Sequence, residues 1–287
     1  MKRRLNLEER RERRRRVVAR SKFALPSAIT LISVLCGFSS IVMSINAVGE
    51  EATRSFMIAA GLLVLAGVFD GLDGRVARAT NTTTEFGVQL DSLADVLSFG
   101  MAPAILAYRY GFFELGRVDP QLRAIGWAAS FFLVACGALR LARFNVQVGY
   151  VDSRFFVGMP IPAGAACVAS VILCWPASPT THLYAYCFAA GLFLVGLLLV
   201  STVRFPSFKK ASHHPRSIHW TTLAFLVILS LMIIFKERFF VGFFAAYILA
   251  TLLLNLAWKL GWRGVEPPVR PHRRTEELQP EEPAPEV

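Results

Sequence analysis

The chain has 287 residues, of which 54% are hydrophobic, and its formal net charge is +11. With a mean hydropathy of +0.48, it is too apolar for an ordinary soluble domain and is typical of a polytopic membrane protein. The positive charge does not indicate nucleic-acid binding, because the basic residues lack interleaved aromatic side chains and a base-reading motif. The composition predicts an all-α membrane protein.

Apolar segments need about 20 residues to cross the hydrocarbon core of a bilayer. Eight segments are candidates, which makes about eight transmembrane helices. In chain order they are 26–48, 53–78, 87–109, 122–143, 160–177, 182–203, 218–236 and 239–259. They belong to a membrane-embedded domain, 23–260, between a basic N-terminal segment, 1–22, and a tail, 261–287, whose proline and charge predict disorder.

Basic residues are distributed unevenly between the two sides of these helices. If the N-terminus is cytoplasmic, the cytoplasmic segments hold 22 of the 31 lysines and arginines, and the outer loops hold six. This asymmetry follows the positive-inside rule and predicts that both termini are cytoplasmic. The arginine-rich start also suits attraction to anionic lipid head groups, and it shows no signal-peptide cleavage site.

Four aspartates lie within the second and third predicted helices: Asp70, Asp73, Asp91 and Asp95. Each carboxylate in a bilayer costs about 2.5–3.5 kcal/mol. The short connection makes the two helices antiparallel neighbours, and spacings of three and four residues place each pair on one helix face. At about 1.5 Å per residue, all four lie roughly 7–13 Å inside the cytoplasmic helix ends. The sequence therefore predicts one carboxylate cluster near the lipid phosphates.

Clustered carboxylates suit hard divalent cations such as Mg²⁺ or Mn²⁺. Two such ions would balance four negative charges and attract a pyrophosphate. One alternative is an architectural salt-bridge network with Arg75, Arg78 and Arg140. Another is the ion or proton pathway of a transporter. Four acids exceed what architecture needs, and the remaining predicted helices carry no acids toward the other side, which favours the metal site.

The spacing of these residues follows a family signature. The pattern Asp70-x2-Asp73-Gly74-x2-Ala77-Arg78-x8-Gly87-x3-Asp91-x3-Asp95 resembles that of the CDP-alcohol phosphotransferases, with eight fixed positions over 26 residues. Members cleave a CDP-alcohol, transfer its phosphoalcohol to a second alcohol and release CMP. The resemblance implies a six-helix membrane core, two ions of Mg²⁺ or Mn²⁺, and a homodimer.

Three further stretches narrow the expected substrates. DSLADVLSFGMAPA at 91–104, RLARFNV at 140–146 and FFVGMPIPAGA at 155–165 resemble the bacterial branch of the family that joins CDP-diacylglycerol to L-serine. Choline, glycerol 3-phosphate and inositol phosphate stay open as acceptors. The resemblance implies a bacterial inner-membrane enzyme whose active site faces the cytoplasm. The helices after about residue 180 carry no diagnostic motif.

The resemblance also implies roles for individual residues. Asp70, Asp73 and Asp91 would be metal ligands, and Asp95 would lie near the metals and act as the general base. Relatives often begin the first helix with Pro-Asn, whereas this chain has Pro26-Ser27. Any nucleotide contact of that asparagine would fall to Ser27 or be absent. The residues expected to bind CDP-diacylglycerol are Asp70, Gly74, Ala77, Arg78, Ser27 and Thr30.

The carboxylate of serine should be bound by a cation. Arg140 and Arg143 lie three residues apart and share a face at the end of the fourth predicted helix, and Asn145 follows them. These three residues are the candidates for serine binding. The alternative is that the two arginines anchor the helix at the membrane surface or hold the lipid phosphate.

Overall fold

The computed structural model describes residues 27–79, 85–147, 155–206 and 237–260. Within these ranges, six helices are long and apolar enough to cross a membrane, and a seventh apolar helix is shorter. The prediction of an all-α, polytopic membrane protein is confirmed, with one pair of three-residue strands as the exception among the described elements. The predicted helix 218–236 lies outside the described residues.

The elements follow the predicted order. The N-terminal helix covers Ser27–Ile45. The other elements are η1 (Gly49–Glu51), α2 (Ala52–Ala79), α3 (Glu85–Asp95), η2 (Val96–Met101), α4 (Ala102–Gly111), η3 (Leu115–Arg117), α5 (Pro120–Gln147), β1 (Phe155–Val157), α6 (Ile161–Cys174), α7 (His182–Val200), β2 (Arg204–Pro206) and α9 (Glu237–Lys259). With 28 residues each, α2 and α5 are about 42 Å long, whereas α6 with 14 residues is about 21 Å long.

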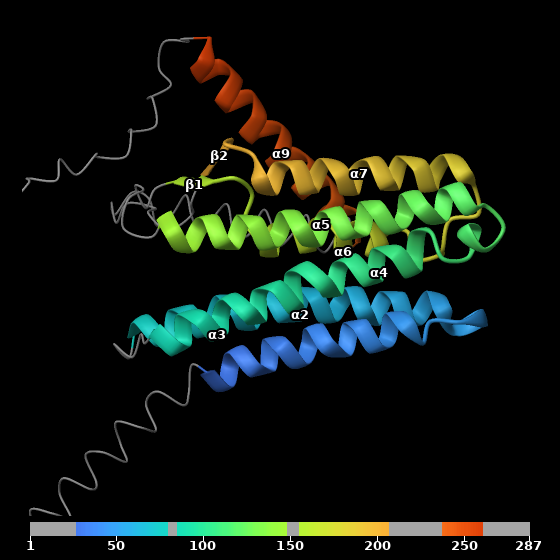
Figure 1. Ribbon diagram of the computed structural model, residues 1–287, viewed down its shortest axis with the longest axis horizontal. Coiled ribbons are helices and arrows are strands. Elements are labelled where there is room, and N and C mark those ends of the chain that lie inside the picture. Colours follow the sequence, from blue (N-terminus) through green and yellow to red (C-terminus); the bar gives the residue numbers. More distant parts are fainter. Residues whose placement is uncertain (1–26, 80–84, 148–154, 207–236, 261–287) are drawn as a thin grey trace, which may run out of the picture.

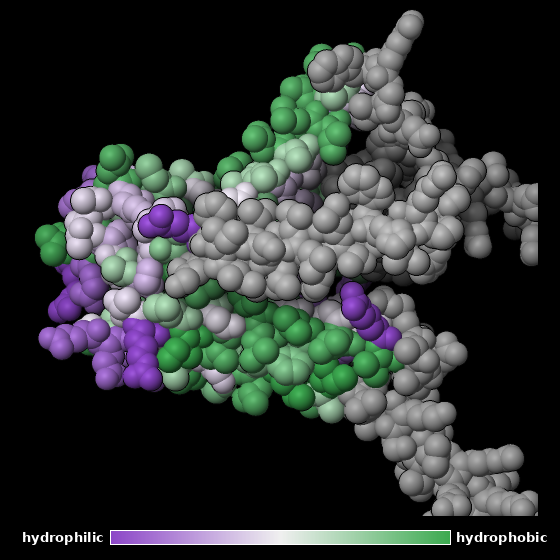
Figure 2. Space-filling view, turned by 180° about the vertical axis from the view of Figure 1, so that it is seen from behind, coloured by the Kyte–Doolittle hydropathy of each residue, from purple (hydrophilic) through white to green (hydrophobic). Residues whose placement is uncertain are grey.

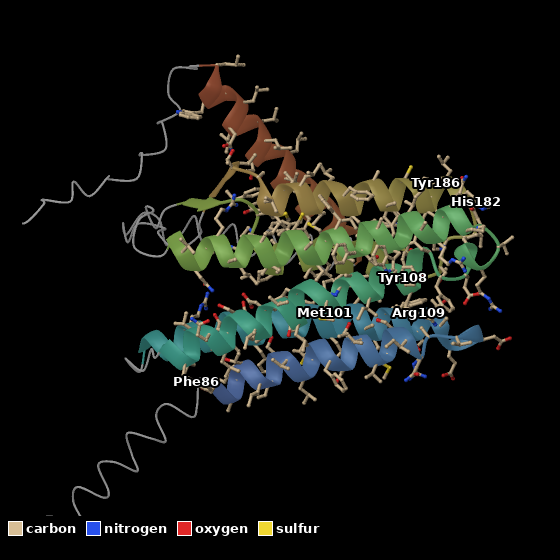
Figure 3. The ribbon with its side chains drawn as sticks, viewed as in Figure 1. Phe86, Met101, Tyr108, Arg109, His182 and Tyr186 are labelled. Atoms are coloured by element: carbon tan, nitrogen blue, oxygen red, sulfur yellow. The ribbon has the colours of Figure 1, made fainter. Side chains whose placement is uncertain are left out.

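Most of the helices run along one long axis (Figure 1). The N-terminal helix and α2 lie beside α3 and α4, while α5 packs along α7, α2 packs against α6, and α6 packs against α9. Figure 3 marks the two ends of the bundle: Phe86 lies where α3 begins, and Arg109 and His182 lie at the other end. We call the end with Phe86 the acid-bearing end, because the four aspartates lie in the helix segments nearest to it.

The sides of the bundle are apolar (Figure 2), whereas hydrophilic residues gather toward one end. Large hydrophobic side chains are exposed on several helices. Among them are Leu35, Leu93, Phe131, Leu139 and Leu197, each exposed over more than half of its surface. A soluble protein would bury such side chains, whereas hydrocarbon is a compatible solvent for them. The fold is therefore that of an integral membrane protein.

The third span is not a uniform α-helix. η2 is π-helical, and the Ala102 N–H donates to the Leu97 carbonyl five residues earlier. Pro103 explains this wide turn, because proline has no N–H and its ring crowds the carbonyl four residues before it. The hydrophobic pattern predicts an unbroken helix over 87–109, and Pro103 is the residue that indicates the interruption. The wide turn begins directly after Asp95, the last residue of α3.

The N-terminal helix packs closely against η2. A Cβ atom on Gly37 would lie 2.7 Å from Ser98 Oγ and 2.8 Å from Ser98 Cα. Ser98 Oγ also donates to the Ser33 carbonyl at 3.3 Å. Because the Gly37 backbone lies against both the side chain and the backbone of Ser98, there is no room for a larger residue at position 37. The contact holds the π-helical segment, and with it the end of α3, against the N-terminal helix.

Gly37→Val should therefore destabilise the protein by about 1–3 kcal/mol, the usual cost of overpacking a tight contact. The measurement is the thermal unfolding of the detergent-solubilised protein. Gly61→Ala is the matched control, because no atom lies within 4 Å of the position where its Cβ would be. Equal unfolding temperatures for Gly37→Val and the unmodified protein would contradict the close packing.

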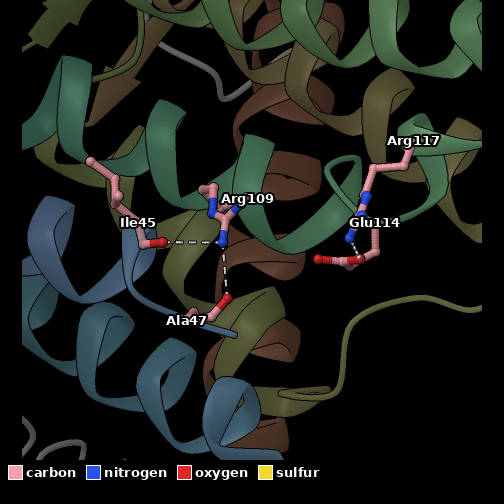
Figure 4. Close-up of polar contacts among 5 residues, drawn as sticks. All are labelled: Ile45, Ala47, Arg109, Glu114 and Arg117. Carbon is pink, nitrogen blue, oxygen red and sulfur yellow. Dashed lines mark hydrogen bonds and ion pairs between the residues drawn. The ribbon is translucent and has the colours of Figure 1, made fainter. Parts of the chain in front are cut away.

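At the end opposite the aspartates, Arg109 caps the N-terminal helix (Figure 4). Its Nε donates to the Ser44 carbonyl at 3.1 Å, and its Nη2 donates to the carbonyls of Ile45 at 3.1 Å and Ala47 at 2.9 Å. The end of a helix leaves carbonyls without intrahelical donors, and the guanidinium supplies hydrogen bonds there. The Ser44 carbonyl also accepts from the Ala47 N–H at 3.4 Å. The nearby ion pair between Arg117 and Glu114, at 3.6 Å, is exposed and adds little stability.

Candidate active site

Three of the four aspartates come together in space. Ligand atoms of Asp70, Asp91 and Asp95 all lie within 4.8 Å of one another, and the three side chains are half-buried. Asp70 comes from α2, and the other two come from α3, which confirms that the two helices present their acids to each other. Asp70 and Asp95 lie close enough for their carboxylates to interact electrostatically. This is the carboxylate cluster at the acid-bearing end.

Asp73 lies outside this group of three. Only 6% of its surface is exposed, and its Oδ2 accepts a hydrogen bond from Thr30 Oγ1 at 2.7 Å. The helical spacing predicts all four acids at one level. The structure shows three that converge and a fourth that the N-terminal helix holds.

Arg140 is the cation beside the cluster. Its side chain is buried, with 7% of its surface exposed, and its Nε has no hydrogen-bond partner among the described residues. The guanidinium interacts electrostatically with Asp95 and Asp70, and its Cζ lies 5.3 Å from the centre of the Phe144 ring. A buried guanidinium with an unsatisfied donor can accept an anion such as a carboxylate or a phosphate.

Arg143, one turn further along α5, is used differently. Its Nη1 donates to the Val200 carbonyl at 2.8 Å, and its Nη2 donates to the carbonyl of Ser201 at 3.1 Å. These groups form the end of α7, where carbonyls lack intrahelical donors. The predicted role of Arg143 in serine binding stays a prediction, and serine would have to share its guanidinium with α7.

A short strand pair lies beside this contact. β1 and β2 are antiparallel, with Phe156 opposite Phe205. Gly158 directly follows β1 and has a φ of 80°, a conformation that favours glycine. Its backbone packs against Leu199, and any side chain at position 158 would collide with the Leu199 carbonyl. Strand pair and glycine together tie the start of α6 to the end of α7 at the acid-bearing end (Figure 1).

Asn145 links α5 to α3. Its Nδ2 donates to Ser92 Oγ at 3.0 Å, and Ser92 directly follows Asp91. Asn145 is exposed and therefore accessible to a ligand from the acid-bearing end. Ser92 was not among the predicted site residues, although its position beside Asp91 indicates it.

The predicted nucleotide-binding residues lie on the N-terminal helix and on α2. Ser27 is the first residue of the N-terminal helix and is half-buried, and Thr30 is the partner of Asp73. Gly74 lies on α2 next to Asp73. Ala77 and Arg78 belong to the last turn of α2, and their side chains lie outside the described part of the chain.

The residues present fit a divalent cation. Three carboxylates from two helices converge on one point and offer only oxygen ligands, the set that Mg²⁺ and Mn²⁺ prefer. Among the described side chains, Arg140 is buried beside the acids while Arg75 is exposed. One buried guanidinium does not balance four carboxylates, so the architectural alternative leaves uncompensated negative charge within the membrane. This acidic cluster can therefore hold a metal ion.

Comparison with known proteins gives a consistent result. The sequence pattern described as CDP-alcohol phosphatidyltransferase matches residues 23–203. The chain is 37% identical over 211 residues to a CDP-diacylglycerol–serine O-phosphatidyltransferase of Helicobacter pylori, covering 72% of this chain and 79% of that protein. It is also 37% identical over 189 residues to the archaetidylserine synthase of Methanothermobacter thermautotrophicus, covering 65% of this chain and 71% of that protein.

Proposed function

The chain belongs to the CDP-alcohol phosphatidyltransferase family, and we propose that it transfers the phosphatidyl group of CDP-diacylglycerol to the hydroxyl of L-serine. The products are phosphatidylserine and CMP. The observation that carries this proposal is the convergence of Asp70, Asp91 and Asp95 beside the buried Arg140. Carboxylates can hold the cations that bind a pyrophosphate, and the guanidinium can bind the carboxylate that distinguishes serine from simpler alcohols.

The reaction needs a base, because a serine hydroxyl is a weak nucleophile at neutral pH. In the proposed reaction, the serine Oγ forms a bond to the phosphorus of the phosphatidyl group. The bond from that phosphorus to the CMP oxygen breaks, and its electrons stay on CMP. The hydroxyl proton goes to Asp95, which lies at the end of α3 and is half-buried in the cluster.

The remaining site residues bind and orient. Asp70, Asp73, Asp91 and Asp95 are the proposed ligands of two Mg²⁺ or Mn²⁺ ions, which would supply positive charge to the pyrophosphate. Arg140 is proposed to bind the serine carboxylate, and Arg143 and Asn145 are the other predicted serine-binding residues. On the nucleotide side, the predicted residues are Asp70, Gly74, Ala77, Arg78, Ser27 and Thr30.

Further parts of the proposal concern the protein in its membrane. The distribution of basic residues supports cytoplasmic termini and an active site that faces the cytoplasm of a bacterial inner membrane. A catalytic domain over 23–260, flanked by a basic segment and a tail, contains the whole family match, 23–203. A homodimer stays a prediction from the family resemblance.

The test supplies purified protein with CDP-diacylglycerol, Mn²⁺ or Mg²⁺, and radiolabelled serine, choline, glycerol 3-phosphate or inositol phosphate in separate reactions. We expect label to enter lipid from serine only. Removal of divalent cations with a chelator should abolish transfer, and added Mn²⁺ or Mg²⁺ should restore it. Label from another acceptor would keep the family chemistry and overturn serine as the substrate.

A transporter is the alternative from a different class. It predicts that the purified protein binds divalent cations and moves a solute across vesicle membranes without consuming CDP-diacylglycerol. The position of the acids at one end of the bundle favours the enzyme, because transporter sites tend to lie near the membrane midplane.

A further inference from the structure

Three hydroxyl groups of the N-terminal helix donate hydrogen bonds to α2. Ser40 Oγ donates to the Ala59 carbonyl at 2.9 Å, and Ser33 Oγ donates to the Ala66 carbonyl at 3.1 Å. Thr30 Oγ1 donates to Asp73 Oδ2 at 2.7 Å. All three donors are buried. The residue number of the acceptor increases as that of the donor decreases, which is the pattern expected for two antiparallel helices.

The Thr30 hydrogen bond differs from the other two in its acceptor. Ser33 and Ser40 donate to backbone carbonyls, so their hydrogen bonds join helix to helix. Thr30 donates to a charged side chain that lies three residues from Asp70 on α2. A charge-assisted hydrogen bond of this length is about twice as strong as a neutral one and directs the carboxylate that accepts it.

We propose that Thr30 is a positioning residue that orients the Asp73 carboxylate toward a divalent cation. The inference rests on the proposed metal site and assigns Thr30 a role through Asp73 rather than through the nucleotide. The Thr30 hydroxyl is a neutral donor, so it directs the carboxylate without cancelling its charge. The remaining lone pairs of the carboxylate are then available to the cation.

The surroundings explain why the hydrogen bond matters. Thr30 and Asp73 are each only 6% exposed, so water does not readily replace a lost partner. Without the hydroxyl, the carboxylate would keep its charge but lose the donor that directs it. Removing a residue that hydrogen-bonds to a metal ligand typically lowers the metal affinity about 10–100-fold.

The experiment compares Thr30→Val with Ser33→Ala. Each variant removes one buried hydroxyl from the same helix–helix contact, but only Thr30→Val removes the donor to an aspartate. Mn²⁺ affinity is measured without substrate, by isothermal titration and by the rise in unfolding temperature on adding Mn²⁺. We expect Thr30→Val to weaken Mn²⁺ binding about 10–100-fold and Ser33→Ala to leave it unchanged.

Two further variants keep the test decisive if Thr30→Val does not fold. Thr30→Ser retains the hydroxyl and should retain Mn²⁺ affinity close to that of the unmodified protein. Thr30→Cys retains the volume with a weaker donor and should give an intermediate loss. Unchanged Mn²⁺ affinity in Thr30→Val or Thr30→Cys, or an equal loss in Ser33→Ala, would overturn the positioning role.

Kinetics separate this inference from the proposed function. If the unmodified protein binds Mn²⁺ but transfers no label from serine, the proposed function fails while the Thr30 comparison still stands on binding. If transfer occurs and Thr30→Val raises the KM for CDP-diacylglycerol with Mn²⁺ affinity unchanged, Thr30 contacts the nucleotide and the inference is wrong.

Discussion

Asp95→Asn should lower the rate of phosphatidyl transfer to serine by about 10²–10⁴-fold, the usual contribution of a positioned general base. Asparagine has nearly the same shape as aspartate but cannot accept the hydroxyl proton. Asp95 is suited to this role because it ends α3, directly before the π-helical turn, and lies within the carboxylate cluster beside Arg140. The measurement is kcat with saturating CDP-diacylglycerol, serine and Mn²⁺.

The control for this substitution is Glu114→Gln, which makes the same chemical change at an exposed position beyond the end of α4, away from the aspartates. Its transfer rate should match that of the unmodified protein. The unfolding temperature of Asp95→Asn should stay near the original value, since the substitution removes one of several mutually repelling charges. A transfer rate within a few-fold of the original would mean that another group takes the proton.

Arg140→Gln should raise the KM for serine about 10–100-fold. A charge-assisted hydrogen bond is worth about 1.5–3 kcal/mol, and 1.4 kcal/mol corresponds to a factor of ten. The reason lies in the burial of Arg140 and in its unsatisfied Nε beside the carboxylate cluster. Ethanolamine, which lacks the serine carboxylate, is the informative second acceptor. The preference for serine over ethanolamine should fall with the same factor.

Arg143→Gln is the matched comparison, because the two arginines share a face of α5 and differ in their partners. Arg143 donates to carbonyls at the end of α7, so its loss should lower the unfolding temperature and raise the KM for serine less than Arg140→Gln does. If Arg143→Gln raises this KM and Arg140→Gln does not, the proposed roles of the two arginines are reversed.

Much of the architecture could be predicted from local pattern. Long apolar segments must form helices in a membrane, because hydrocarbon supplies no partner for backbone N–H and C=O groups. For this reason the predicted helices agree with Ser27–Ile45, α2, α5, α7 and α9 to within a few residues. The π-helical turn was missed, because the hydrophobic pattern of the third span continues through Pro103 and only the hydrogen bonds reveal the wider turn.

The sequence by itself determined that Asp70 faces Asp91 and Asp95. Helical spacing places the acids of each helix on one face, and the short connection makes the two helices antiparallel neighbours. Only the tertiary structure decided the partners of Asp73, Arg140 and Arg143. Asp73 is held by Thr30, 43 residues away in the chain, and Arg143 by the end of α7, more than 50 residues away. Helical periodicity specifies which face a side chain occupies. Which group it meets there depends on how distant helices pack, so two arginines on one face have different partners.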